Sequence, residues 1–190
     1  LPNADNSAFT FHLRRNARWS NGDPITARDF VYSLRRALAP SLAARYAYIA
    51  YDIEYAQAFN EGGAFLQDPA SNAFVADPAS PARRLVVPGD PADREKALKA
   101  VTLAELARGK RVVPVRAEDV GVEAPDEYTV VYHLRQPVPF MAGLVTNQFF
   151  RPVPQKAVEA FGDAWTRPEH IVTSGPFTLT VWKQIGRAHV

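Results

Sequence analysis

Residues 9–38 combine a strand pattern, a turn and a helix pattern, and they constrain the fold more than any other stretch of the chain. Phe9, Phe11 and Leu13 alternate with polar residues, which is the period-two pattern of a half-buried strand. The Asn-Gly-Asp-Pro sequence at 21–24 predicts a turn, because Gly adopts positive φ freely and Pro fixes its own φ. The sequence therefore predicts a strand, a tight turn and a helix in direct succession.

The helix pattern has its own start signal and one apolar face. Thr26 fits an N-cap, and Asp29 three residues later is the expected partner in a capping box. The apolar stripe consists of Phe30, Val31, Leu34, Ala37 and Leu38. Arg28, Arg35 and Arg36 fall outside this stripe, so we expect all three in water.

Composition excludes several classes of protein. The chain has 190 residues, enough for one or two domains, and its net charge of +2 is too small to indicate a nucleic acid or membrane-surface partner. It has no cysteine, which excludes disulfides and thiolate metal sites. No apolar run approaches the roughly 20 residues that a membrane-spanning helix needs.

The two ends of the sequence have unusual features. Leu1 replaces an initiator Met and the first strand pattern begins almost at once, so we expect the chain to be a fragment whose missing signal peptide says little. Residues 185–190 match the translation of a common sequencing adapter. We therefore expect a non-native tail at 185–190, with the genuine sequence ending near Gln184.

No catalytic constellation is evident. The sequence lacks a P-loop, a dinucleotide-binding glycine fingerprint and a His-Glu-x-x-His pair. His12 and His133 fall on polar faces of predicted strands, while Ser20 and Ser174 lack the glycines of a nucleophile elbow. We therefore expect a protein that is not an enzyme, with no cofactor and no metal.

Two aromatic features require a choice between packing and binding. Trp19 beside the first turn is expected to pack between strand and helix. Four tyrosines, Tyr46, Tyr48, Tyr51 and Tyr55, fall within ten residues, and each hydroxyl needs a partner when buried. They either turn their rings inward from a helix or face a polar ligand.

The stretch from residue 62 to residue 116 is rich in Gly and Pro and has a weaker pattern. It predicts two short helices. One runs from about 91 to 100 with Asp90 as its cap, and the other begins at Thr102 as cap, with Glu105 as box partner, and ends near Gly109. Nothing in the stretch indicates chemistry.

One long motif resembles a known family. The pattern FxFHLRxxAxWSNGDPxTAxDFVYSxxR, at 9–36, is similar to the entry segment of extracytoplasmic solute-binding proteins that serve peptide ABC transporters, above all the oligopeptide-binding members. The resemblance implies an α/β fold of the type II periplasmic-binding-protein kind, a two-lobe clamp with mixed sheets. Residues 1–184 would form part of the first lobe, and most of 62–116 would be a surface insertion, because compact members have a shorter connection there.

The resemblance extends to later segments. Residues 119–145 resemble the second strand pair of the family, with a turn at Pro125-Asp126 and a strand through 129–135 in one sheet with the first strand and in the same phase. After it we expect a short buried helix near 140–145, a helix after Pro154, and a strand that holds Phe177, Leu179 and Val181.

The resemblance also implies a ligand and a site. Tyr46 aligns with a family tyrosine that lies in the peptide cleft, whereas the other three tyrosines are expected to be structural. Asn147 stands where some members have a cleft histidine shortly before the Pro-Val-Pro segment. Asn can bond to a peptide backbone but carries no charge, so any charge-based preference at this position is in question.

The function implied is the binding of oligopeptides outside the cytoplasm and their delivery to the membrane permease of an ABC importer. The expected protein is a monomer, either periplasmic or anchored as a lipoprotein. Two alternatives stay open. The same fold could bind a dipeptide, a metal chelate, haem or an opine, or it could be the ligand-sensing domain of a cytoplasmic transcription regulator.

Overall fold

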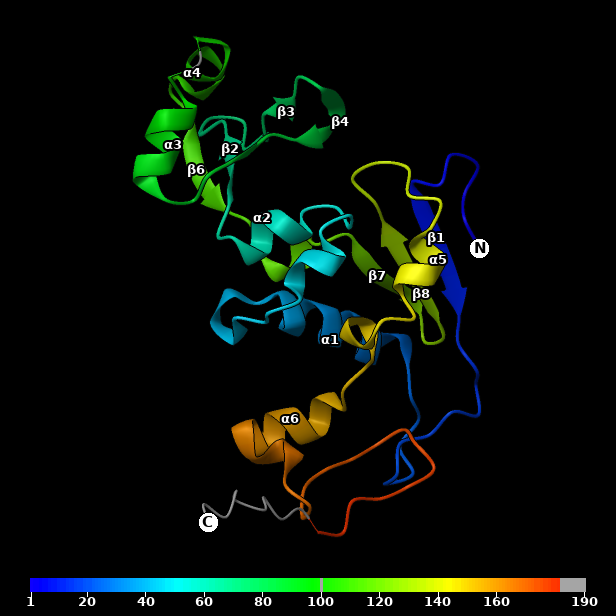
Figure 1. The fold of residues 1–190 in the computed structure, drawn as a ribbon. Helices are drawn as coiled ribbons and strands as arrows, with labels where there is room; N and C mark the ends of the chain where they lie inside the picture. Colours follow the sequence, from blue (N-terminus) through cyan, green and yellow to red (C-terminus); the bar gives the residue numbers. More distant parts are fainter. Residues whose placement is uncertain (100, 182–190) are drawn as a thin grey trace, which may run out of the picture.

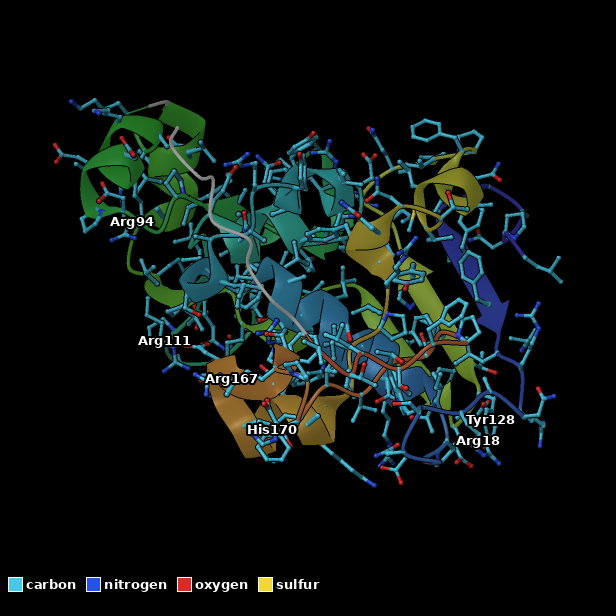
Figure 2. All side chains as sticks on the ribbon, turned by 60° about the horizontal axis from the view of Figure 1, so that its bottom comes forward. Arg18, Arg94, Arg111, Tyr128, Arg167 and His170 are labelled. Atoms are coloured by element: carbon cyan, nitrogen blue, oxygen red, sulfur yellow. The ribbon has the colours of Figure 1, made fainter. Side chains whose placement is uncertain are left out.

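The computed structural model describes residues 1–99 and 101–181, and its centre is a three-stranded antiparallel sheet (Figure 1). The sheet consists of β1 (Ala8–His12), β7 (Val122–Asp126) and β8 (Thr129–His133), in the order β1-β8-β7. Phe9 pairs with Tyr132. The strand patterns at 9–13 and 129–135 thus lie side by side in one sheet with their apolar residues on one face, as the sequence predicted. Figure 2 labels Tyr128, the residue just before β8.

Helix α1 (Ala27–Leu38) begins at the cap that the sequence indicated and packs on this sheet. The carboxylate of Asp29 accepts from the backbone N–H of Thr26 at 2.8 Å. Leu34 and Leu38 are fully buried and belong to the core. Residue 39 caps the C-terminus and a 3-10 turn begins at Pro40, which has no backbone N–H with which to continue the helix.

One expectation about this helix is wrong. Arg35 is half-buried against β7, where its guanidinium donates to the carbonyls of Glu118 and Val122 at 3.4 and 3.3 Å. The apolar stripe of α1 is therefore wider on this side than the local pattern indicated, because β7 covers part of the adjacent face. Trp19, in contrast, is only 5% exposed, as expected of a packing residue.

The main core lies between this sheet, α1 and the segments around them. Its buried members are Phe9, Ala27, Leu34, Leu38, Ala47, Ala50, Ile53, Ala56, Val120, Val122, Val130, Tyr132, Leu134, Val138, Met141 and Phe150. Burial of Tyr132 raises the pKa of its phenol. The core thus joins segments from both ends of the chain around α1.

Short helices connect these parts. They are η1 (Pro40–Leu42), η2 (Ala47–Ala50), α2 (Ala56–Asn60), η3 (Ala117–Asp119), α5 (Met141–Leu144), η4 (Gln148–Phe150), α6 (Gln155–Phe161) and η5 (Gly162–Thr166). The predicted helix after Pro154 is α6, and Gly162 ends it with φ of +50°. The predicted short helix near 140–145 is α5, in which Met141 is buried while Phe140 before it is exposed.

Residues 62–116 form a small subdomain with its own sheet, which Figure 1 shows at the opposite end from β1. Its elements are β2 (Ala64–Gln67), β3 (Ala76–Asp77), β4 (Ser80–Arg84), β5 (Val86–Val87), α3 (Pro91–Ala97), α4 (Val101–Ala107) and β6 (Arg111–Pro114). The sheet order is β5-β2-β6, and a separate cluster of Ala64, Leu66, Leu85 and Val87 forms its core. The sequence anticipated the two helices but not this sheet.

The capping predictions for these two helices have different outcomes. The carboxylate of Asp90 accepts from the backbone N–H groups of Ala92 and Asp93, so it caps α3 as predicted. Helix α4 begins at Val101, so Thr102 lies inside it and is not its cap. The helix thus begins two residues earlier than the Thr-x-x-Glu signal predicted, which shows how weak this signal is at a short helix.

Two further predictions are wrong. The turn between β7 and β8 lies at Glu127-Tyr128, two residues after the expected Pro125-Asp126. No strand forms at 177–181, and Phe177 is 83% exposed. Alternating apolar residues form a strand only beside a partner, and the described residues provide none there. The expected non-native tail at 185–190 lies outside the described residues.

Candidate ligand-binding site

Tyr46 and Tyr48 present two aromatic rings to solvent from a turn that is fixed in the core. Between and after them, Ala47 and Ala50 of η2 are buried. The side chains of Tyr46 and Tyr48 are 48% and 61% exposed, and their ring centroids lie 6.3 Å apart at a tilt of 58°. Within the described part of the chain neither hydroxyl has a hydrogen-bond partner, so both are free to bond to a ligand.

The other two tyrosines of this stretch are structural, as expected. The hydroxyl of Tyr51 donates to the side chain of Asn60 at 2.7 Å. The hydroxyl of Tyr55 accepts from the backbone N–H of Arg84 at 2.8 Å, and its ring packs edge-on against Phe65. Tyr48 differs from both, because its ring contacts only the neighbouring Tyr46 among the aromatic side chains of the described residues.

Asn147 lies at the start of η4. Its side-chain oxygen accepts from the backbone N–H of Phe149 at 2.9 Å, which leaves the amide NH2 free to donate. Among the described residues no hydrogen bond joins Asn147 to Tyr46. The two predicted ligand residues are therefore not hydrogen-bonded to each other, and their binding role stays a prediction.

A groove of about 820 Å³ separates the region around α2 from residues 83–93 of the small subdomain. Its wall includes Tyr51, Glu54, Tyr55, Glu61, Asp77, Arg83, Arg84, Val87, Asp90 and Arg135. The volume falls within the range of small-molecule sites, roughly 300 to 1,000 Å³. The sequence did not predict this groove.

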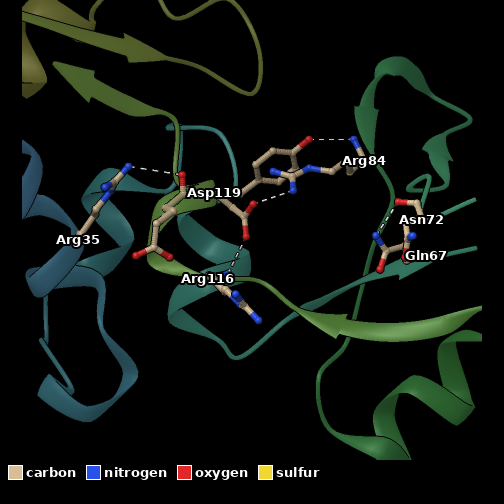
Figure 3. Close-up of polar contacts among 8 residues, drawn as sticks. Arg35, Gln67, Asn72, Arg84, Arg116 and Asp119 are labelled. Carbon is tan, nitrogen blue, oxygen red and sulfur yellow. Dashed lines mark hydrogen bonds and ion pairs between the residues drawn. The ribbon is translucent and has the colours of Figure 1, made fainter. Parts of the chain in front are cut away.

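Arg84 is the central side chain of this region (Figure 3). Its guanidinium pairs with Asp119 at 2.7 Å and stacks over the rings of Phe65, Phe74 and Tyr55 at 4.0, 5.0 and 4.8 Å. Burial opposes the charge, but the hydrogen bonds to Asp119 and Tyr55 outweigh it, so the pKa of Arg84 is raised. The charge of Arg84 is thus paired within the protein and is not available to a ligand.

Two more arginines of the groove also have partners. Arg83 lies 3.5 Å from the carboxylate of Glu54 and donates to the carbonyls of Leu134 and Arg135. Arg135 in turn lies 3.5 Å from Asp52. The only sequence signal for this network was an Arg-Arg doublet at 83–84 in a Pro-rich stretch. Such a doublet is typical of a solvent-exposed surface.

The two histidines that could have served in catalysis or metal binding each have a side-chain partner. The Nδ1 atom of His12 lies 3.2 Å from the hydroxyl of Thr129, and the Nε2 atom of His133 lies 2.9 Å from the carboxylate of Glu123. Across residues 1–99 and 101–181, no three His, Asp or Glu side chains are grouped as metal ligands would be. No helix in that part of the chain has the length and apolarity needed to span a membrane.

Sequence comparison identifies the class of protein. Residues 2–189 match the family described as bacterial extracellular solute-binding proteins, family 5 Middle. The chain therefore belongs to this family of solute-binding proteins. Its mixed α/β fold is that of part of one lobe of a type II periplasmic-binding-protein clamp.

Individual relatives are oligopeptide-binding proteins. The periplasmic oligopeptide-binding protein OppA of Escherichia coli K12 is 32% identical over 180 residues, which are 95% of this chain and 24% of that protein. A Bacillus anthracis oligopeptide ABC transporter substrate-binding domain superposes with a TM-score of 0.66 at 30% identity, covering 96% of this chain and 26% of its own.

A structure of Haemophilus influenzae OppA in complex with RPPGFSPFR superposes with a TM-score of 0.58 at 33% identity. The match covers 90% of this chain and 24% of that one. The chain thus spans about a quarter of the length of the relatives that it matches.

Proposed function

We propose that the full-length protein containing this chain binds oligopeptides outside the cytoplasm and delivers them to the membrane permease of an ABC importer. One observation carries the proposal: nearly the whole chain matches oligopeptide-binding proteins at 32–33% identity. The exposed Tyr46 supports it, because an aromatic ring with a free hydroxyl can both pack on a peptide and bond to its backbone.

In this proposal residues 1–184 are part of the first lobe of a two-lobe clamp, and most of 62–116 is a surface insertion on that lobe. Tyr46 and Asn147 contact the peptide, with the free amide of Asn147 as a donor to a peptide carbonyl. Ligand contacts to both lobes favour the closed form, since a ligand shifts such an equilibrium by its difference in affinity for the two states. The permease then recognises the closed form.

The remaining parts of the proposal concern the setting of the protein. It acts as a monomer in the periplasm or as a lipoprotein on the outer face of the cytoplasmic membrane, and it binds without catalysis.

Calorimetric titration of the full-length protein tests this function. The ligands are RPPGFSPFR, mixed tripeptides to pentapeptides, and mixed dipeptides, each titrated separately into the same preparation. We expect binding of the tripeptides to pentapeptides with dissociation constants in the micromolar range or tighter, on the order of −8 kcal/mol. Binding of dipeptides alone would replace oligopeptides by dipeptides as the ligand, and no heat from any peptide would contradict the proposal.

A further inference from the structure

Three arginines lie along one side of α1 at a groove that is separate from the one beside Arg84. Arg28, Arg35 and Arg36 line a groove of about 510 Å³ between α1, η3 and the first residue of α6. We call this the α1 groove. Figure 1 shows α1 between α2 and α6, and Figure 3 shows Arg35 reaching from α1 toward the turn of η3.

The arginines of the α1 groove have no ion-pair partner in the part of the chain that the structure describes. Among the described residues, no carboxylate lies at ion-pair distance from Arg28, Arg35 or Arg36. The Nε atom of Arg35 is buried and has no hydrogen-bond partner there. Glu118 is the one acidic side chain on the wall, and the charge of Glu159 acts on the nearby Tyr32 hydroxyl, so the three arginines outnumber the carboxylates around the groove.

This arrangement contrasts with the arginines of the subdomain groove. Arg83, Arg84 and Arg135 each have a carboxylate partner within 3.5 Å. Arg28 and Arg36 lack such a partner among the described residues, so their charges are available to a ligand that supplies carboxylates. The α1 groove is therefore the place where an anionic partner would gain most.

The surface between the arginines indicates what kind of anion fits. It consists of Val31, Tyr32, Ala39, Phe59, Ala117 and Ala124, with Gln155 at one end. A small inorganic anion would neutralise the arginines but leave this apolar floor uncovered. A peptide segment that carries both carboxylates and an apolar side chain would use the two features together, as Arg-rich and aromatic-rich protein interfaces do.

We propose that the α1 groove is a docking site for an acidic peptide segment of a partner protein. Carboxylates of the segment form bidentate hydrogen bonds with Arg28 and Arg36, because the planar guanidinium matches the geometry of a carboxylate. An apolar side chain of the segment packs on Tyr32 and Phe59. This contact is independent of the peptide that the clamp itself transports.

The test is fluorescence anisotropy of a dye-labelled peptide, EELEFE, titrated with the 190-residue chain and with the full-length protein. We expect binding that weakens several-fold when salt rises from about 50 to about 300 mM, because salt screens partly exposed charges. The basic peptide KKLKFK is the charge control: it should not bind the 190-residue chain, and any binding of it in the clamp of the full-length protein should be unchanged by R28E with R36E. Binding by the short chain but not by the full-length protein would overturn the proposal, since another segment of the protein would then fill the groove.

Matched variants separate the groove from overall charge. Joint replacement R28E and R36E should weaken EELEFE binding about tenfold or more, as expected for arginines at the centre of an interface. R14E with R15E makes the same change of net charge at exposed positions outside the α1 groove and should change binding by less than about twofold. Equal losses in both pairs would overturn the proposal in favour of nonspecific attraction.

Further measurements exclude other anions and unfolding. The midpoint of urea unfolding is measured for R28E with R36E, for R14E with R15E, and for the milder pair R28Q with R36Q. These midpoints show whether a loss of peptide affinity arises from unfolding. R28Q with R36Q should retain the wild-type midpoint and still lose affinity. Vesicles of phosphatidylglycerol that bind the wild type but not R28E with R36E, without binding of EELEFE, would assign the groove to lipid instead. Full competition by millimolar phosphate would assign it to a small anion.

Discussion

At the scale of single residues, the burial of the ring and the hydrogen bonding of the hydroxyl determine whether a tyrosine stabilises the fold or can bind a ligand. Tyr51 and Tyr55 have hydroxyls that are bonded inside the protein, whereas the hydroxyls of Tyr46 and Tyr48 lack partners in the described residues. The backbone that carries the exposed pair is fixed by buried alanines. The backbone of Tyr46 is therefore fixed, while its side chain stays outside the core.

Replacement of Tyr46 by alanine should weaken oligopeptide binding by the full-length protein by about 1 kcal/mol or more, as loss of a hydrogen-bonding aromatic contact does. Tyr46→Phe should recover the part of the affinity that the ring contributes. Titration calorimetry measures both variants. Phe140→Ala is a control, because Phe140 is also an exposed aromatic side chain. Wild-type affinity in Tyr46→Ala would remove Tyr46 from the site.

At the scale of elements, one arginine joins the small subdomain to η3, the turn that precedes β7 of the main sheet. Arg84 at the end of β4 stacks on Phe65 of β2 and pairs with Asp119 of η3. The cluster under β2 is small, so contacts of this kind contribute a large share of its attachment. The subdomain should therefore respond to changes at this one position.

Arg84→Met keeps most of the apolar stem but removes the charge. We expect the backbone amides of β2 to exchange hydrogen about tenfold faster, which corresponds to loss of roughly 1.4 kcal/mol of local stability. Hydrogen exchange with mass spectrometry measures this, with β8 as an internal reference. Arg108→Met serves as a control at an exposed position of the same subdomain. Unchanged exchange in β2 would show that packing alone attaches the subdomain.

A second contact makes the subdomain sensitive to acid. The carboxylate of Asp68 accepts from Lys110 at 2.5 Å and from the backbone and side chain of Ser71, and these bonds hold its pKa well below the usual range. A lowered pKa in the folded state gives stability that is present above the unfolded-state pKa. That stability is lost as pH falls through the folded-state pKa.

The midpoint of urea unfolding should therefore fall between about pH 5 and about pH 3, and it should fall less steeply in Asp68→Asn than in the wild type. At pH 7 the variant should be the less stable of the two. Asp163→Asn is the matched control, because Asp163 is exposed and has no side-chain partner among the described residues. Identical pH profiles for wild type and Asp68→Asn would show that the Lys110 contact adds nothing.

At the scale of the whole molecule, the chain contains only part of one lobe, whereas a two-lobe clamp contacts its ligand with both lobes. The chain covers about a quarter of the relatives that it matches. Buried contacts on one side of a peptide leave its other side in water. Such a half-site has less interaction energy to offset the entropy lost on association.

The isolated 190-residue chain should therefore bind mixed tripeptides to pentapeptides much more weakly than the full-length protein, or not at all. Calorimetry on both proteins under the same conditions checks this. Far-ultraviolet circular dichroism and a cooperative urea transition of the short chain are the control that it is folded. Micromolar peptide affinity in the 190-residue chain would contradict the two-lobe account.

The sequence by itself determined the elements whose causes are local. The turn signal at 21–24, the start of α1 at Thr26 and Asp29, and the cap of α3 at Asp90 were predicted correctly, because each depends on residues within one turn of each other. At the first of these the chain turns over residues 20–22, with Gly22 at φ of +90°. The long motif at 9–36 was also sufficient to indicate the family, and the match over residues 2–189 confirmed it.

Tertiary structure alone decided the features that join distant parts of the chain. Arg35 was predicted in water and lies against β7, because Val122, 87 residues away, supplies its acceptor. The alternating residues at 177–181 predicted a strand, but a ladder needs a partner strand that no local pattern contains. The α1 groove and the pairing of Arg84 with Asp119 likewise exist only after folding. The wall of the groove comes from several separate segments, and the two partners of the ion pair lie in different segments.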